Sequence, residues 1–247
     1  MMKDLIIKQL KEMQISYSSA FLEWLDNVND NILETIMFTL TNLMNFDGIQ
    51  DHINSISNVI DLSNDNEREI RNRIAELIAC RFIKNVLGYE IAKIESSKTS
   101  IYSPYRNKDK KSCDILAIAG TIEHYFEVKD SSTEIMSRKD YGDHIGYKPA
   151  TRPYLEEWLY WKINESIEKG ATDLFAIVPF WVNPLKDNPK DFFSSWINSI
   201  CMTHFKLVEQ TDANQYKLRI DLKIPDFFKR IILPNRGRHF ELVLVNE

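Results

Sequence analysis

Residues 112–130 read SCDILAIAGTIEHYFEVKD, and this stretch decides the fold. Two short apolar runs are separated by Gly120 and Thr121. A Gly-X pair between two such runs is typical of a two-residue type II′ turn. We therefore expect an antiparallel hairpin whose strands pair outward from residues 119 and 122.

Charged residues lie inside both strands of this hairpin. The register places Asp114 directly opposite Glu127, and Lys129 shares the face of Glu127 because side chains alternate along a strand. Like charges in opposed positions destabilise a strand pair, and a divalent cation with oxygen ligands offsets that repulsion. The pattern favours metal-assisted hydrolysis of a phosphodiester, with Lys129 stabilising charge on the phosphate. A solvated sheet face, on which charged and apolar residues alternate, is the alternative.

The segments on either side of the hairpin predict a mixed α/β order. Before it we expect a helix, a strand and a basic loop, over 66–87, 89–96 and 97–112. After it we expect a long polar connection, a helix and a strand, over 130–152, 152–170 and 173–180. Gly88 and Gly170 are the predicted C-caps of the two helices. The remaining predicted elements are a helix and three strands, over 189–203, 205–210, 215–224 and 240–245.

This order, αβββαβ, resembles that of the PD-(D/E)xK nuclease superfamily, which has the restriction-endonuclease-like fold with a central mixed sheet. The matching residues are Asp114 on the second strand and the acid and lysine of Glu127-x-Lys129 on the third. The resemblance covers about residues 66–180, and Cys113 stands where the family places a proline. It implies that Asp114 and Glu127 bind Mg²⁺, for which Mn²⁺ can substitute. It also implies that Lys129 is catalytic and positions the attacking water.

Many members of the superfamily also use an acidic residue from the helix before the sheet. Glu69 and Glu76 are seven residues apart, so they share one face of the predicted helix. That face becomes apolar toward the end of the helix, as expected if only the start of the helix reaches a solvated site. We expect Glu76 to be the fourth catalytic and metal-binding residue, with Glu69 in reserve. An ordinary solvated face, with Arg73 as the partner, is the alternative.

The N-terminal part of the chain differs from the rest in charge. Residues 1–66 hold three lysines and ten acidic residues, a net charge of −7, which leaves +2 for the remainder because the whole chain carries −5. Apolar residues recur there near the helical period, and polar clusters at 27–31 and 44–48 separate the predicted helices. We expect this region to form a homodimer or to dock a partner protein. The expected domains are an acidic helical extension (1–65) and a nuclease domain (66–247), the latter with a core at 66–180 and a C-terminal αβββ addition at 181–247.

Basic residues cluster in loops around the predicted site, where they suit contacts to DNA phosphates. A single basic loop is more often simply solvated. Aromatic residues crowd the predicted helix at 152–170, which is more typical of core packing than of base stacking. The candidate DNA-binding residues are Arg106, Lys108, Lys110, Lys111, Arg138, Lys139, Lys148, Arg152, Arg236 and Arg238.

The sequence also argues against a membrane span, a signal peptide and a cysteine-based zinc site. No apolar run approaches the length of a membrane span, and the charged N-terminus does not resemble a signal peptide, so we expect a cytoplasmic protein. The three cysteines show no zinc-binding spacing. A second D-x-K, formed by Asp221 and Lys223, lacks the surrounding order of elements and is interpreted as surface charge.

The sequence therefore predicts a Mg²⁺-dependent endodeoxyribonuclease, and the resemblance implies a prokaryotic restriction or anti-phage defence role. Within the same class, the alternatives are a DNA repair or recombination nuclease, such as a junction resolvase, and a transposition end-cutting subunit. From another class, the alternative is a non-catalytic subunit that keeps the fold and binds DNA or a partner.

Overall fold

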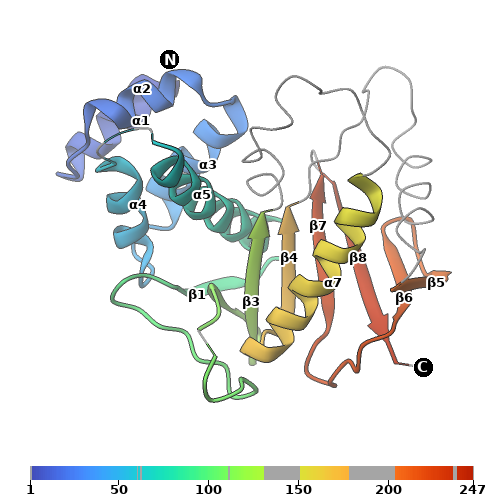
Figure 1. The fold of residues 1–247 in the computed structure, drawn as a ribbon. Coiled ribbons are helices and arrows are strands. Elements are labelled where there is room, and N and C mark those ends of the chain that lie inside the picture. Colours follow the sequence, from blue (N-terminus) through green and yellow to red (C-terminus); the bar gives the residue numbers. More distant parts are fainter. Residues whose placement is uncertain are drawn as a thin grey trace. The chain divides into compact units, whose positions relative to one another are not determined.

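The protein divides into two compact units, whose helices and strands are labelled in Figure 1. The first unit comprises Met1–Tyr102 and Ser112–Val128, and the second comprises Ser103–Lys111 and Lys129–Glu247. The structure is a computed structural model, and it describes residues 2–59, 61, 63–110, 112–130, 151–177, 204–235 and 238–246.

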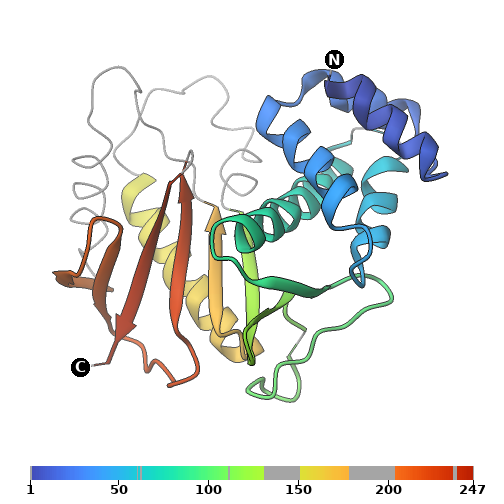
Figure 2. The same cartoon turned by 180° about the vertical axis from the view of Figure 1, so that it is seen from behind.

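The first unit begins with five helices. They are α1 (Met2–Glu12), α2 (Ser19–Asn27), α3 (Asp30–Asn42), α4 (Ile49–Ser57) and α5 (Asn64–Asn85). Ser18 and Asn29 are N-caps, because their side chains accept hydrogen bonds from backbone N–H groups in the first turns of α2 and α3. Helix α3 contacts α1 and α5, and α4 also contacts α5 (Figure 2). The predicted helices and both predicted breaks between them are confirmed.

The predicted domain boundary after residue 65 lies within this unit, because α3 and α4 both contact α5. Helix α5 ends at Asn85, two residues before the predicted end, and its C-cap is Val86. Gly88 has a φ of 70°, a backbone conformation that favours glycine, and the N–H of Tyr89 donates to the carbonyl of Ile83 at 3.1 Å. The turn carries the chain from the helix into the first strand.

Three strands complete the first unit, and the register of the β2–β3 hairpin is the predicted one. They are β1 (Glu90–Ile94), β2 (Ile115–Ala119) and β3 (Ile122–Asp130), paired antiparallel in chain order. Strands β2 and β3 pair from Ala119↔Ile122 to Ile115↔Phe126 around Gly120, whose φ is 63°. The division between the units passes through the end of β3, after Val128.

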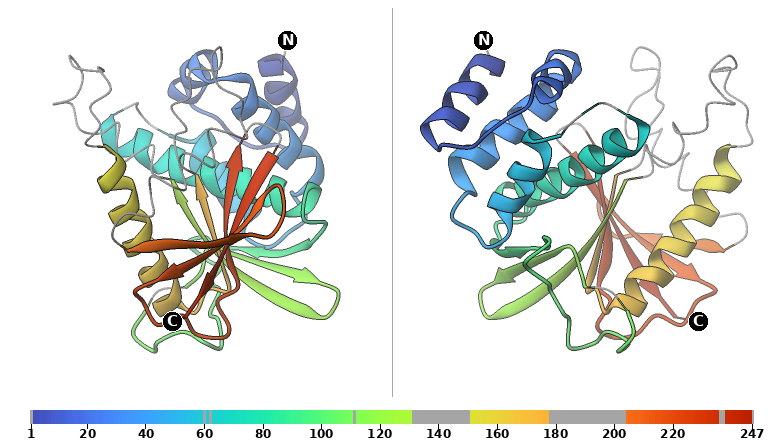
Figure 3. Two further views of the ribbon diagram at one scale, coloured as in Figure 1. Left: turned by 90° about the vertical axis from the view of Figure 1, so that its right-hand side faces the viewer. Right: turned by 60° about the vertical axis from the view of Figure 1, so that its left-hand side comes forward.

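The second unit contains one long helix and a mixed sheet. Its elements are α7 (Thr151–Lys169), β4 (Asp173–Ile177), β5 (Phe205–Gln210), β6 (Gln215–Ile220), β7 (Arg230–Asn235) and β8 (Arg238–Val245). The sheet order is β4-β7-β8-β6-β5, with β4·β7 and β6·β8 parallel and the other pairs antiparallel. Helix α7 lies across these strands, and Trp158, Leu159 and Ile163 pack into the sheet's apolar core (Figure 3).

One strand of this sheet is absent from the sequence-based prediction. Strand β7 pairs with both β4 and β8, and Ile231, Ile232 and Leu233 are completely buried. Its apolar run is short and stops at Pro234, which cannot donate to a ladder, so the segment reads as a turn. The structure tolerates the proline because the β4 pairing ends at Ile232.

The order of the elements from α5 to β4 is the predicted helix, three strands, helix and strand. The chain is therefore a mixed α/β protein, as expected. The predicted strand at 215–224 is shorter, because β6 ends at Ile220. The expected connection at 130–152 lies outside the described residues except at its two ends, and the expected helix at 189–203 lies outside them entirely. Among the described helices, none is long and apolar enough to cross a membrane.

Candidate functional site

Asp114 lies directly before β2, and its carboxylate is part of the sheet's hydrogen bonding. Its Oδ2 accepts the backbone N–H of Val128 at 2.6 Å, where a ladder carbonyl would ordinarily be the acceptor. Its own N–H donates to the carbonyl of Phe126, and its carbonyl accepts from Glu95. The side chain is buried, with 8% of the residue exposed. These contacts fix the carboxylate next to the backbone of β3.

Glu127 immediately precedes Val128 in β3 and is 0% exposed. The regular β2–β3 pairs stop at Ile115↔Phe126, one step before the predicted opposition of Asp114 and Glu127. The Asp114 side chain nevertheless reaches the residue that follows Glu127. The structure therefore brings the two acids to the open end of the β2–β3 hairpin, opposite the turn at Gly120. We refer to this open end as the hairpin end. Burying a carboxylate is costly unless another group compensates its charge.

Lys129 follows Glu127 by two residues in β3 and is the first β3 residue of the second unit. Its Nζ lies 3.1 Å from Oε1 of Glu165 in α7. Lys162 and Lys169, also in α7, lie 3.3 Å and 3.9 Å from the same carboxylate. Burial raises the pKa of Glu165, but the charges of Lys129, Lys162 and Lys169 lower it by more, so its pKa is below the ordinary value.

The predicted helix acid, Glu76, has partners within the first unit. Its Oε2 contacts Nε2 of His52, and the Arg73 guanidinium lies 3.5 Å away. The alternative partner Arg73 is therefore present, together with a histidine that the sequence analysis did not consider. His52 is 1% exposed, and its Nδ1 has no hydrogen-bond partner among the described residues. Nε2 is the ring nitrogen that faces both Glu76 and the Arg73 guanidinium, the latter at 3.4 Å.

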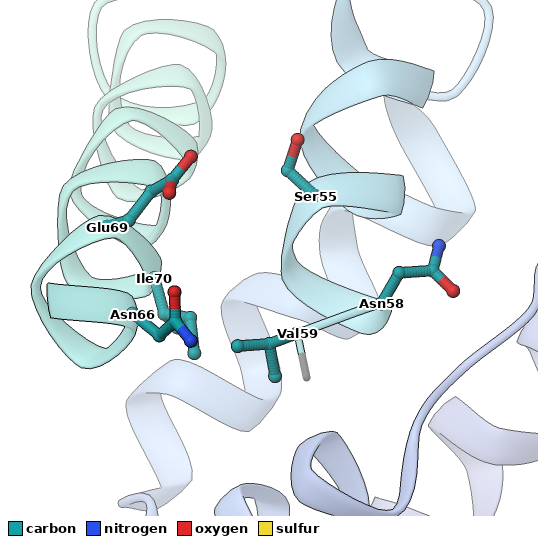
Figure 4. Close-up of a pocket in the computed structure, with 6 residues that line it drawn as sticks. All are labelled: Ser55, Asn58, Val59, Asn66, Glu69 and Ile70. Atoms are coloured by element: carbon teal, nitrogen blue, oxygen red, sulfur yellow. The ribbon is translucent and has the colours of Figure 1, made fainter. Parts of the chain in front are cut away.

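Glu69, the reserve acid, lines a small pocket between α4 and α5 (Figure 4). The pocket has a volume of about 190 Å³. It is lined by Ser55, Asn58, Val59, Asn66, Glu69 and Ile70. The pocket belongs to the helical part of the first unit, so it is a different place from the end of the β2–β3 hairpin.

The donors at the hairpin end fit a hard divalent cation. Asp114 and Glu127 offer carboxylate oxygens, and Mg²⁺ is typically held by one or two carboxylates together with water. Among the described residues, no group of three or more His, Cys, Asp or Glu side chains is placed to hold a metal ion. The metal-binding roles of Asp114, Glu127 and Glu76 therefore stay predictions.

Two of the predicted DNA-binding residues have structural contacts in the loop before β2. The Arg106 guanidinium donates to the carbonyls of Lys108 and Lys110 at 2.8 Å and 3.3 Å and so closes the loop on itself. Lys110 pairs with Glu168 of α7 at 2.7 Å, and the hydrogen bond that it donates to Glu168 raises the pKa of Lys110. Lys108 is exposed.

The same loop packs against the end of α7. Ser103 donates to the carbonyl of Gly170 at 2.7 Å. A Cβ on Gly170, which has a φ of 76°, would lie 2.4 Å from the N of Arg106. The loop therefore packs closely against the end of α7 in addition to carrying basic side chains. Outside the described residues lie Lys111, Arg138, Lys139, Lys148 and Arg236, while Arg152 in α7 and Arg238 in β8 have side chains that the structure does not describe.

The aromatic residues of α7 divide into core and surface. Trp158 is buried in the core of the second unit, as expected, whereas Trp161 is 58% exposed. Tyr160 stacks on His204 with ring centroids 4.3 Å apart. His204 also pairs with Asp221 at 3.1 Å, and the Asp221 side chain is 57% exposed, in agreement with its interpretation as surface charge.

Sequence reasoning did not identify Glu165 or His52 as partners of the predicted site residues. The spacing of Lys162, Glu165 and Lys169 on one helix face was visible in the sequence, but the approach of Lys129 is a tertiary contact. Comparison with protein-family models, curated proteins and solved structures finds no match.

Proposed function

We propose that this protein is a metal-dependent endonuclease that hydrolyses DNA phosphodiester bonds and has a restriction-endonuclease-like core. The observation that carries the proposal is the end of the β2–β3 hairpin. There the Asp114 carboxylate is held on the N–H of Val128, directly beside the completely buried Glu127. Two acids at one strand end supply the carboxylate oxygens that a hard divalent cation prefers.

Each residue has a distinct role in this proposal. Asp114 and Glu127 would hold Mg²⁺ or Mn²⁺, which when bound supplies Lewis acidity toward the phosphate. Asp114 is oriented by the Val128 N–H, so little freedom is lost when it binds a cation. Lys129, two residues beyond Glu127 on the same strand, orients water and stabilises negative charge. Glu76 remains the proposed fourth acid and is tested separately, because it contacts His52 and Arg73.

The proposed biological role is prokaryotic restriction or anti-phage defence, with a repair or recombination nuclease as the alternative. Cutting both strands of a duplex calls for two active sites, so we propose a homodimer or a partner chain that is bound through the acidic N-terminal helices. A non-catalytic subunit is favoured by one observation, the hydrogen bond that gives Asp114 a structural use. Catalysis by the purified chain distinguishes these possibilities.

The test is cleavage of supercoiled plasmid DNA with Mg²⁺, Mn²⁺ or EDTA. Glu127→Gln keeps the shape of the side chain and removes its charge. Glu123→Gln is the matched control, because Glu123 is an exposed residue of the same strand. We expect metal-dependent cleavage by the wild type and the control and roughly 100-fold or greater loss in Glu127→Gln. Equal cleavage by all three proteins would refute the assignment of Glu127, and absence of cleavage by the wild type with either metal would refute a nuclease that acts alone.

A further inference from the structure

Three lysines converge on one carboxylate in the second unit, and we refer to Lys129, Lys162, Lys169 and Glu165 as the lysine cluster. Lys129 and Lys169 both lie within 4 Å of the same oxygen of Glu165, at 3.1 Å and 3.9 Å. Lys162 lies 3.3 Å from the other oxygen.

Ordinary helix-surface pairing explains only part of this arrangement. Lys162 and Lys169 are three residues before and four residues after Glu165, which are common spacings for weak surface pairs. Lys129 comes from β3, so its approach to the same carboxylate is a tertiary contact that helix spacing does not explain.

The centre of the lysine cluster is more accessible to solvent than its edge. The Glu165 side chain is 41% exposed, whereas the side chains of Lys129, Lys162 and Lys169 are 18%, 22% and 11% exposed. The lysine stems are thus packed into the protein, and their charged ends meet at a point that an external anion can reach. Exchanging the Glu165 carboxylate for another anion requires movement of only one partly exposed side chain.

We propose that the lysine cluster is a subsite for a backbone phosphate of bound DNA, and that Glu165 occupies it when DNA is absent. This inference rests on the proposed function, because DNA is the ligand. A phosphodiester carries one negative charge and several acceptor oxygens, which suit converging lysine ammonium groups. Trp161 lies one helical turn before Glu165 and is exposed, so its ring is available to stack on a base beside that phosphate.

The proposal predicts that substitution of Glu165 and substitution of the lysines change DNA affinity in opposite directions. The probe is a fluorescently labelled DNA duplex, and its anisotropy is followed over a range of salt concentrations with Ca²⁺ in place of Mg²⁺. We expect Lys162→Gln and Lys169→Gln to weaken binding roughly 3- to 10-fold, and each to reduce the slope of log K against log salt by about one. Glu165→Gln should tighten binding by a similar factor, because it removes the competing anion.

The matched control is another lysine–glutamate pair of the second unit. Lys217 in β6 and Glu209 in β5 lie 3.1 Å apart, the same distance as Lys129 and Glu165. Lys217→Gln and Glu209→Gln should leave DNA affinity unchanged within about twofold. Weaker or unchanged binding by Glu165→Gln, or an unchanged salt slope in both α7 lysine variants, would overturn the proposal.

A second measurement does not depend on DNA. Glu165→Gln leaves three lysines without their common carboxylate, so its melting temperature should rise more than that of the wild type when inorganic phosphate replaces chloride at constant ionic strength. An equal rise in the two proteins would count against an anion site. If the variants alter the effect of phosphate but not DNA affinity, the ligand is a free phosphate, and the assignment to DNA is wrong.

These outcomes separate the subsite from catalysis. A wild type that binds DNA with the expected pattern of variants but never cleaves it would refute the nuclease and leave the subsite standing. A wild type that cleaves DNA while the α7 lysine variants bind like the wild type would do the reverse.

Discussion

The end of the β2–β3 hairpin and the lysine cluster hold charge in opposite ways. At the hairpin end, Asp114 and Glu127 are buried, and the hydrogen bond to Val128 keeps the aspartate in place. In the lysine cluster, the central carboxylate of Glu165 is partly exposed, and its partners are lysine side chains from β3 and α7. The comparison suggests that buried acids fixed by backbone atoms suit a permanent metal centre, whereas an exposed acid among lysines suits exchange with a ligand.

The largest expected effect is on catalysis, at the residue shared by strand β3 and the lysine cluster. Lys129→Ala should lower the rate of metal-dependent DNA cleavage roughly 100-fold, because it removes a positive charge that stabilises the transition state. Lys217→Ala, which breaks a pair of the same length, should retain the wild-type rate. Single-turnover plasmid cleavage measures both. A rate within a fewfold of the wild type for Lys129→Ala would limit the lysine to a packing role.

The structural and chemical uses of Asp114 can be separated by two substitutions. Asp114→Ala leaves the buried N–H of Val128 without its acceptor and should lower the free energy of unfolding by about 1–3 kcal/mol. Asp114→Asn keeps an acceptor oxygen and should be destabilised by less, yet it should lose metal-dependent cleavage. Urea denaturation and plasmid cleavage give the two readouts. Full activity in Asp114→Asn would contradict its role as a metal ligand.

Substitution of Glu76 tests whether the proposed metal site includes an acidic residue from α5. Glu76→Gln removes the charge that contacts His52 and Arg73, so we expect a loss of about 1 kcal/mol in stability and roughly 10-fold in cleavage rate. Glu69→Gln, on the same helix, should change neither quantity. A Glu76 variant that is less stable but fully active would restrict Glu76 to a structural partner of His52 and Arg73.

The smallest expected effect is the pH dependence of the lysine cluster. Because the pKa of Glu165 is lower in the folded protein than its ordinary value of 4.5, its contribution to stability is present above that pH and is lost as the pH falls through the lowered value. Glu165→Gln should therefore lose less stability than the wild type between neutral pH and acid. Melting temperatures measured across this range give the comparison, and identical acid dependence would show that solvent screens the cluster completely.

Local signals in the sequence were sufficient for the hairpin and its register. Gly120 allows the tight turn, and the alternation on both sides fixes the pairing that is observed up to Ile115↔Phe126. The bond from Val128 to the Asp114 side chain was not predictable, because it depends on where the regular ladder stops. Strand β7 was missed because a short run ending in Pro234 becomes a strand only through its neighbours β4 and β8.

The contacts of the site residues were harder to predict than the elements that carry them. His52 precedes Glu76 by 24 residues, and Glu165 follows Lys129 by 36, so neither pair leaves a local spacing to detect. Both contacts arise when separate elements pack within one unit. The sequence indicated which side chains are candidates for a functional role, but it could not show which residues contact them in the fold.

The most direct test of the buried acid pair is calorimetric titration of the protein with Mn²⁺, without DNA. The wild type and Glu123→Gln should bind Mn²⁺ with the same affinity, and Glu127→Gln and Asp114→Asn should each weaken binding at least 10-fold, because each removes one of the two charged ligands. Equal Mn²⁺ binding by all four proteins, each shown to be folded, would contradict a metal centre at the end of the β2–β3 hairpin.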